Sequence, residues 1–307
     1  MKILVTGNAS PIGKRFVEIL LGRGHVVIGL DRRGFWQNKN YPENQFKHYQ
    51  CDVRKRPAED VFRKEKPQSV IHLATVSHLQ HLNEKGQRMN LGVTQKIVEY
   101  SHRYGVKTLA FVGRHTFYGA EPDSPLYHKE IEPPSMSSGL PALSDLVAAD
   151  LYAGSALWRY PDIATSVLRI CYTLGESKSG TLASFLKGPK VPTFLGYDPL
   201  FQIIHEEDAM NAVATAVEKK LRGVYNVAGP PPSPLSVVIR ESGRERVTLP
   251  QALMGVAMGT FGLSKLPKGA WDHIKFPVLI DDASFKKATG FEYRFDEATI
   301  LNQFKKS

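Results

Sequence analysis

The chain contains little cysteine and lacks a long hydrophobic segment at its start. Only two cysteines, Cys51 and Cys171, occur among its 307 residues, and they lie far apart. Two separated cysteines exclude a disulfide framework and are typical of a reducing compartment, so we expect a cytoplasmic protein. The first apolar run ends at Gly7 and is too short for a signal peptide or a membrane span.

The chain also lacks the patterns of a nucleic-acid-binding protein. Its 40 Lys and Arg residues exceed its 30 Asp and Glu residues and give a net charge of +10. The basic residues are scattered in short groups, without an interleaved aromatic stripe, so we expect no nucleic-acid partner. Such a positive field attracts small anions, including dinucleotides and nucleotide sugars.

One later segment, Ala252–Leu263, is strongly apolar and is followed by Lys265 and Lys268. An apolar segment with basic flanks can lie in a membrane interface, but it is more often a helix or an oligomer contact. We favour the second interpretation and expect no stable membrane insertion.

The first half of the chain alternates apolar strands with amphipathic helices, which predicts an α/β fold of the Rossmann type, a doubly wound parallel sheet. We expect the sheet domain to span 1–172 and to be completed by 201–228. A smaller C-terminal substrate lobe is expected from 173–200 and 229–307. Pro and Ser are frequent in 121–139, which we interpret as a surface loop. The predicted strands are Lys2–Thr6, His25–Leu30, Gln45–Cys51, Ser69–Ala74, Thr108–Gly113 and Ala164–Cys171, and the predicted helices are Pro11–Arg23, Pro57–Lys66, Glu84–Tyr104 and Leu143–Trp158.

A glycine-containing turn joins the first strand to the first helix. Gly7 permits a tight turn, and Gly13 permits close packing of the helix on the strand. Ser10 is suited to the N-cap and Pro11 to the first helical position. The free N–H groups of such a helix end can hold a pyrophosphate. The turn therefore predicts a dinucleotide site.

Asp31 closes the second strand, at the position from which an acid can accept hydrogen bonds from both ribose hydroxyls. An acid there would repel a 2′-phosphate, whereas Arg32 and Arg33 could pair with one. We expect NAD as the cofactor and consider NADP the less favoured alternative.

Six ordered segments of the chain resemble the extended short-chain dehydrogenase/reductase superfamily, whose members include NAD-dependent nucleotide-sugar epimerases and dehydratases. The likeness extends over nearly the whole chain, with Ser10 in place of the middle glycine of the family's turn. The segments are Thr6–Gly13, Asp52–Val53, His72–Thr75, Asn90 with Gly92 and Thr94, Phe201–Ala209, and Gly223–Gly229.

This resemblance implies which residues contact the dinucleotide. They belong to the first turn and to the carboxyl ends of the following strands. The expected cofactor-binding residues are Gly7, Asn8, Ser10, Pro11, Ile12, Gly13, Asp31, Arg32, Asp52, Val53, Leu73, Ala74, Thr75, Asn90 and Val112.

The family's catalytic pair has no counterpart in the sequence. The family uses a Tyr as acid and base and a Lys four residues later, which lowers the pKa of the Tyr. None of the 12 tyrosines is followed by a Lys at that spacing. The matching positions hold Pro141 and Asp145, the usual Ser position holds Arg114, and Tyr172 replaces an Asn that contacts a nucleotide-sugar phosphate. We therefore expect conventional Tyr–Lys catalysis to be absent.

Three neighbouring residues are candidates for substitute chemistry: His115, Thr116 and Tyr118. If the chain stays extended there, Arg114, Thr116 and Tyr118 share one face. Alternatively, Tyr118 is a packing residue and the other two line the cleft. His78 and His81 lack an acidic or Cys partner nearby and make a poor metal site, so no metal is expected.

Two functions follow as alternatives. The first is a nucleotide-binding sensor or scaffold that has lost catalysis. The second is an active epimerase, dehydratase or reductase with non-standard acid/base residues, acting on a nucleotide sugar or another anionic small molecule. By resemblance alone, we expect a homodimer formed through the helices near 84–104 and 143–158.

Overall fold

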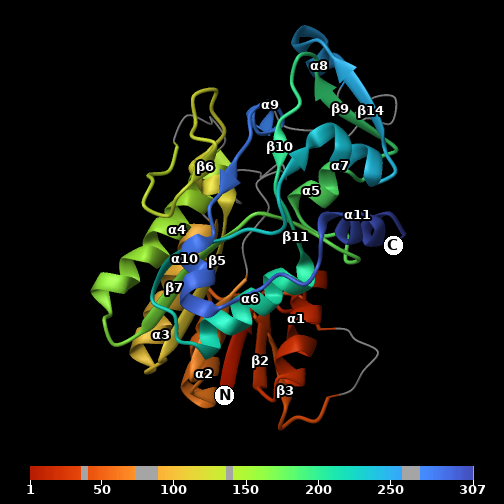
Figure 1. Cartoon of the computed structure of the whole chain (residues 1–307). Helices are drawn as coiled ribbons and strands as arrows, with labels where there is room; N and C mark the ends of the chain where they lie inside the picture. Colours follow the sequence, from red (N-terminus) through yellow and green to blue (C-terminus); the bar gives the residue numbers. More distant parts are fainter. Residues whose placement is uncertain (36–40, 74–88, 136–140, 258–269, 307) are drawn as a thin grey trace.

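The computed structural model describes residues 1–35, 41–73, 89–135, 141–257 and 270–306. Its centre is a parallel seven-stranded sheet in the order β12-β7-β5-β4-β1-β2-β3 (Figure 1). This order and the flanking helices confirm the predicted doubly wound α/β fold. The strands are β1 (Lys2–Thr6), β2 (Val26–Asp31), β3 (Phe46–Gln50), β4 (Ser69–His72), β5 (Thr108–Arg114), β7 (Ala164–Ile170) and β12 (Gly223–Val227).

Helices cover both faces of the sheet (Figure 1). The helices α2 (Arg56–Glu65), α3 (Met89–Arg103) and α4 (Pro141–Arg159) lie on one face. The other face is covered by α1 (Pro11–Gly22), α6 (Glu206–Glu218) and α10 (Ala283–Thr289). The predicted helices match these elements closely, and the part of the Glu84–Tyr104 prediction before Met89 lies outside the described residues.

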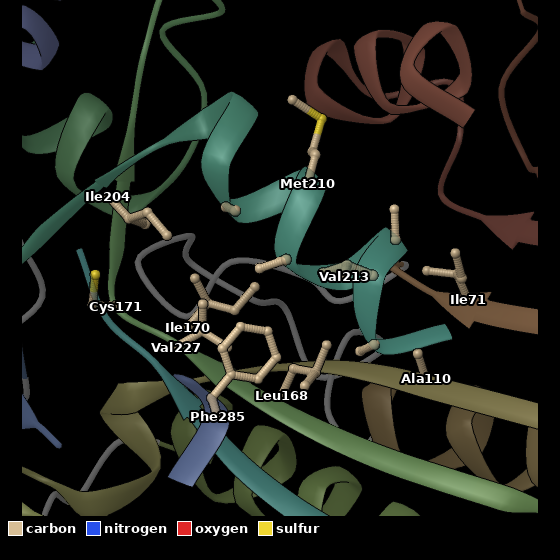
Figure 2. Close-up of a cluster of buried hydrophobic side chains, with 14 of the residues drawn as sticks. Ile71, Ala110, Leu168, Ile170, Cys171, Ile204, Met210, Val213, Val227 and Phe285 are labelled. Carbon is tan, nitrogen blue, oxygen red and sulfur yellow. The ribbon is translucent and has the colours of Figure 1, made fainter. Parts of the chain in front are cut away.

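Strand residues alternate between two hydrophobic cores. Ile3 and Val5 point to the core under α6, whereas Leu4 points to the core under α2 and α3. Figure 2 shows Met210 and Val213 of α6 above the strand residues of the first core. Because both faces are buried, the strands are continuous apolar runs.

A buried histidine fastens α3 to the sheet. The His72 ring lies 2.7 Å from the Thr6 hydroxyl at Nδ1 and 3.1 Å from the Thr94 hydroxyl at Nε2. Thr94 donates its own proton to the Asn90 carbonyl, so the His72 Nε2 must donate and Nδ1 must accept. Burial lowers the pKa of His72 to about 4, which keeps this ring neutral.

The loop predicted for 121–139 contains a short strand. β6 (Tyr127–His128) pairs in parallel with β15 (Leu279–Ile280), near the far end of the chain. A two-residue strand is too short to have a periodicity, and its partner is distant in sequence, so the composition of the segment could not predict it.

A second, smaller core lies above the carboxyl end of the sheet. It joins residues of segment 173–200 to residues near the C-terminus, including Phe194, Leu235 and Ile300. Phe285 of α10 belongs instead to the sheet core. The remaining elements are β8 (Tyr172–Leu174), α5 (Thr181–Phe185), β9 (Lys190–Phe194), β10 (Leu200–Phe201), β11 (Ile203–His205), β13 (Ser233–Pro234), α7 (Leu235–Glu241), β14 (Glu245–Leu249), α8 (Gln251–Ala257), α9 (Asp272–Lys275) and α11 (Glu297–Lys306).

The apolar segment Ala252–Leu263 is described as far as Ala257. It begins within α8, where Met254 is fully buried in the smaller core and Leu253 is 55 % exposed. One face of α8 therefore packs inside the lobe. Within the described residues, no helix is both long enough and apolar enough to span a membrane.

Candidate dinucleotide and substrate cleft

A cavity of about 670 Å³ lies at the carboxyl ends of the central strands. In parallel α/β sheets, ligands bind at this edge, where the strand order reverses. The cavity extends from the β1–α1 turn, past the ends of β2 and β5, to residues of the smaller lobe. Ten predicted cofactor residues line it: Gly7, Ser10, Ile12, Asp31, Arg32, Asp52, Val53, Leu73, Asn90 and Val112.

The β1–α1 turn is closed as tightly as its glycines allow. Gly7 has a positive φ of 77°, which an L side chain rarely adopts. A Cβ atom on Gly13 would come within 2.3 Å of the Gly7 carbonyl oxygen, so the packing requires glycine there. Pro11 occupies the first turn of α1, as predicted.

The Ser10 hydroxyl serves the turn itself. It accepts a hydrogen bond from the Gly13 N–H at 3.0 Å and donates its proton to the Gly7 carbonyl at 2.9 Å. This confirms the predicted N-cap. Because a hydroxyl has a single proton, Ser10 cannot also donate to a phosphate without giving up the Gly7 bond.

Several predicted cofactor residues do not line the cavity. Asn8 is fully buried, and its side chain contacts His48 at 3.0 Å and lies against Gly29. Pro11 and Gly13 shape the turn from outside the cavity wall. Ala74 and Thr75 lie outside the described residues.

Asp31 lies at the end of β2, where the sequence placed a ribose-binding acid, but its oxygen atoms are already engaged. One accepts from the backbone and Nε of Arg33, and the other accepts from Arg33 Nη2 and the Ala9 N–H, all at 3.0 to 3.2 Å. Burial would raise the pKa of Asp31, but the hydrogen bonds from Arg33 outweigh it, and the pKa lies below its ordinary value. Ribose hydroxyls would therefore have to displace Arg33, whose side chain is 61 % exposed.

Asp52 shows the same arrangement one strand further along. Its two oxygens accept from the backbone, Nε and Nη2 of Arg54, with distances of 2.6 to 3.0 Å. The hydrogen bonds from Arg54 lower the pKa of Asp52 to about 2. The acids at this end of the cleft are thus ionised and paired, and Arg32 adds a further positive charge.

The chain does not stay extended beyond β5. Arg114 ends the strand, and His115–Tyr118 form a single 3₁₀ turn with all four residues buried. The predicted face shared by Arg114, Thr116 and Tyr118 is therefore wrong. A 3₁₀ turn repeats every three residues, not every two, and Gly119, with a φ of 78°, ends it.

The three catalytic candidates are separated by this turn. His115 and Thr116 line the cavity, whereas Tyr118 does not. The Tyr118 hydroxyl donates to Asn226 Oδ1 at 2.8 Å and accepts from Arg169 at 3.0 Å, and Arg169 pairs with the buried Asp150. Tyr118 thus lies in a buried polar network behind the cleft.

His115 is held in one tautomer. Its Nδ1 lies 3.2 Å from the Ile170 carbonyl oxygen, which can only accept, so Nδ1 carries the proton. Burial, with the neighbouring His273, lowers the pKa of His115 to about 3. The ring is therefore neutral at pH 7 with a bare Nε2, for which no partner occurs among the described residues. Thr116 is 1 % exposed, and its hydroxyl also has no partner among the described residues.

Asp145 occupies the position of the family's Lys and points to the start of α3. Its carboxylate accepts from the Asn90 N–H at 2.8 Å and from the Leu91 N–H at 3.1 Å. These are free donors of the first turn of α3, so Asp145 caps that helix from a neighbouring element.

Arg114 is the charged group that faces the cavity at the end of β5. Its guanidinium donates to the Thr181 hydroxyl at 3.1 Å and forms no ion pair with a described carboxylate. Burial lowers its pKa from the ordinary value. The sequence identified Arg114 only as a missing serine, and Thr181 carried no signal, because the lobe segment lacks periodicity. Among the described residues, no group of three His, Cys, Asp or Glu side chains could hold a metal ion.

Three comparisons bear on this cleft. The profile of the NAD dependent epimerase/dehydratase family matches residues 3–228. An uncharacterized protein of Mycobacterium tuberculosis is 28% identical over 261 residues, which cover 81% of this chain and 67% of the relative.

Two solved structures have a similar fold. The UDP-glucose 4-epimerase of Thermotoga maritima, with UDP-glucose, superposes with a TM-score of 0.77 at 22% identity, covering 100% of this chain and 98% of the other. The dTDP-glucose 4,6-dehydratase of Bacillus anthracis, in complex with NAD, gives 0.76 at 18% identity, covering 100% and 96%.

The family profile covers the whole sheet domain, including the turn, the ends of β2 to β5 and β12. The cleft retains the dinucleotide end of the family pattern, and NAD is the cofactor that this family supports. The chain belongs to the NAD-dependent epimerase/dehydratase family.

Proposed function

We propose that the protein binds NAD in this cleft without Tyr–Lys catalysis and acts as a nucleotide-binding sensor or scaffold. The observation that carries the proposal is the capping of α3 by Asp145. A lysine there would face the ribose and lower the pKa of a tyrosine. Asp145 has the opposite charge, and both of its carboxylate oxygens accept hydrogen bonds from backbone N–H groups of another helix.

The residues that line the cavity fit a dinucleotide. The β1–α1 turn keeps its tight shape only because Gly13 lacks a Cβ atom. The N–H groups at the start of α1 would then hold a pyrophosphate. Asp31 would accept the ribose hydroxyls after Arg33 moves away, and Asp52 with Val53 would face the adenine. When bound, NAD would supply hydride transfer. The protein side would bind and orient it through these groups.

The first experiment is mass spectrometry of the nucleotide that co-purifies, together with calorimetric titration of NAD⁺, NADH and NADP⁺. We expect NAD(H) to bind and NADP⁺ to bind more weakly. The NAD-loaded protein is then incubated with UDP-glucose and dTDP-glucose, and product formation is followed by chromatography. Failure of every dinucleotide to bind at millimolar concentration would refute the proposal.

The second candidate function is an active enzyme with non-standard acid/base groups. It is favoured by the bare Nε2 of His115 and the unpartnered Thr116 hydroxyl, both in cavity-lining residues. Loss of a general acid/base typically costs about 10²–10⁴ in rate, so slow turnover would be the expected sign. Turnover that disappears in His115→Gln and in Thr116→Val would favour this function over a sensor.

We also propose a cytoplasmic homodimer. The two cysteines are free thiols, which supports a reducing compartment. On α4, Leu151 is 51% exposed and Trp158 is 84% exposed, one above the other two helical turns apart. An apolar stripe of this kind suits a helix-to-helix contact between two copies. Light scattering after size exclusion tests it, and Trp158→Glu should give a monomer.

A further inference from the structure

We propose that the end of the cleft formed by the end of β5 and the smaller lobe is an anion-binding subsite, in which Arg114 holds a carboxylate or phosphate group of a second ligand. This inference rests on the proposed function, because the second ligand is taken to bind beside NAD.

The charges that line the cavity leave one guanidinium without a counter-ion at this end. The lining acids are Asp31, Asp52 and Glu206. The first two pair with the arginines of their own loops. Glu206, which is 1% exposed, accepts from the Ser177 backbone and hydroxyl and lies 3.5 Å from Arg15. No acid among the described lining residues is left for Arg114.

A guanidinium in such surroundings favours an anion strongly. Arg114 is partly buried, and its guanidinium forms a single hydrogen bond to a described residue, the neutral hydroxyl of Thr181, at 3.1 Å. Removing a charged group from water is costly unless it is paired. A planar guanidinium can bind a carboxylate or phosphate through two parallel hydrogen bonds, which supplies the missing pairing.

The neighbouring groups complete the subsite. Thr181 fixes the guanidinium from the lobe. Thr116 lines the same cavity, and its buried hydroxyl has no partner among the described residues. A hydroxyl can donate to an anionic oxygen. The ring of Tyr172 lines the cavity here too and stacks on Phe201, with centroids 5.1 Å apart, so one wall of the subsite is aromatic.

The test uses three probes and the full chain saturated with NAD⁺. UDP-glucuronate and UDP-glucose differ only in whether the sugar carries a carboxylate or a hydroxymethyl group, and inorganic phosphate is the third probe. Each is titrated by calorimetry into the natural protein, Arg114→Gln, Arg114→Lys and Thr181→Val. Arg240→Gln, an exposed arginine of α7 outside the cavity, is the matched control.

We expect at least one anionic probe to bind the natural protein and to lose tenfold or more in affinity in Arg114→Gln. Arg114→Lys should retain part of that affinity, because it keeps the charge but not the planar pair of donors. A preference for UDP-glucuronate that disappears in Arg114→Gln assigns the subsite to a carboxylate. Equal losses for both UDP sugars, or a loss for inorganic phosphate alone, assign it to phosphate.

The inference is overturned if Arg114→Gln binds every probe as tightly as the control, or if no anionic probe binds the NAD-loaded protein. It is also overturned if Arg114→Gln loses NAD affinity itself, because Arg114 would then serve the dinucleotide. The NAD⁺ titration of the natural protein is a separate measurement, so a failure of the proposed function is distinguished from a failure of the subsite. Circular dichroism of each variant verifies folding.

Discussion

The two ends of the cleft differ in how their charged groups are partnered. At the adenosine end, Asp31 and Asp52 each pair with an arginine two residues further along the same loop. At the other end, Arg114 has no carboxylate partner among the described residues, and His115 and Thr116 each have a polar atom without a described partner. The charges at the first end are balanced by their own neighbours, whereas those at the second end are not.

This difference in charge pairing supports the proposal that the Arg114 end of the cleft binds an anionic ligand. Asp31 can exchange the hydrogen bonds of Arg33 for those of ribose hydroxyls, and the 61% exposed Arg33 side chain can then carry its charge into water. An unpaired guanidinium, by contrast, is stabilised only when a ligand arrives. Asp145, which the sequence predicts at the position of the family's Lys, caps α3 and so contributes to stability.

Acid should affect the buried histidines and the paired Asp52 at different pH values, and this is the largest effect that we expect. Burial places the pKa of His72 at about 4, that of His273 at about 4 and that of His115 at about 3, all below the ordinary 6.5. At a pH between the folded-state pKa values and 6.5, the unfolded chain binds more protons than the folded chain. The free energy of unfolding therefore falls as the pH falls from 6.5 to 4. Each histidine contributes at most about 1.4 kcal/mol per pH unit.

Urea unfolding at pH 7, 6, 5 and 4 measures this slope. His72→Gln should flatten it, while the same change at the exposed His102 should not. The pKa of Asp52, at about 2, lies below its ordinary 3.8, so its stabilising pairing persists above pH 3.8 and is lost only as the pH falls toward 2. Equal free energies of unfolding at pH 7, 6, 5 and 4 would contradict the assignment to the histidines.

A methyl group on Gly13 should weaken dinucleotide binding strongly. Its Cβ would lie 2.3 Å from the Gly7 carbonyl and 2.8 Å from the Asn8 Cα, so the turn must shift. We expect Gly13→Ala to weaken NAD binding about 100-fold and to destabilise the fold by about 1–3 kcal/mol. Gly22→Ala, on the same helix with nothing within 4 Å, is the control. Unchanged calorimetric affinity in Gly13→Ala would show that the pyrophosphate binds elsewhere.

Removing the cap from α3 should reduce stability without affecting chemistry. We expect Asp145→Ala to lower the free energy of unfolding by about 1 kcal/mol, as the loss of an N-cap does. Asp145→Lys, which restores the family's residue type, should cost at least as much and should give no turnover. Urea unfolding and a sugar-nucleotide assay measure the two. Turnover gained in Asp145→Lys would mean that only the lysine was missing.

The smallest effect should come from replacing Arg33, which competes with the ribose hydroxyls for the carboxylate of Asp31. Because it fills the acceptor sites of that carboxylate, Arg33→Ala should raise the ratio of NAD⁺ to NADP⁺ affinity several-fold, with about 1 kcal/mol involved. Competitive titration of the two dinucleotides measures the ratio, with Arg63→Ala, an exposed arginine paired with Asp60, as the control. A fall in the ratio would show that Arg33 favours NAD.

The sequence by itself determined the sheet, the turn and the missing catalytic pair. Short apolar runs that alternate with amphipathic helices are typical of buried parallel strands. The Ser10–Pro11 start of α1 is a local property of four residues. The absence of a Tyr followed by a Lys needs no structure at all. These features depend on neighbours in the chain, so a linear pattern contains them.

Only the tertiary structure decided which side chains pair with one another. Asp145 meets Asn90 across 55 positions, Arg114 meets Thr181 across 67, and Tyr118 meets Asn226 across 108. The turn after β5 is 3₁₀ and not extended, which separates Tyr118 from His115 and Thr116. Such pairings arise because the hydrophobic cores bring distant segments together, and the charge left over at Arg114 can be recognised only after every other pair has formed.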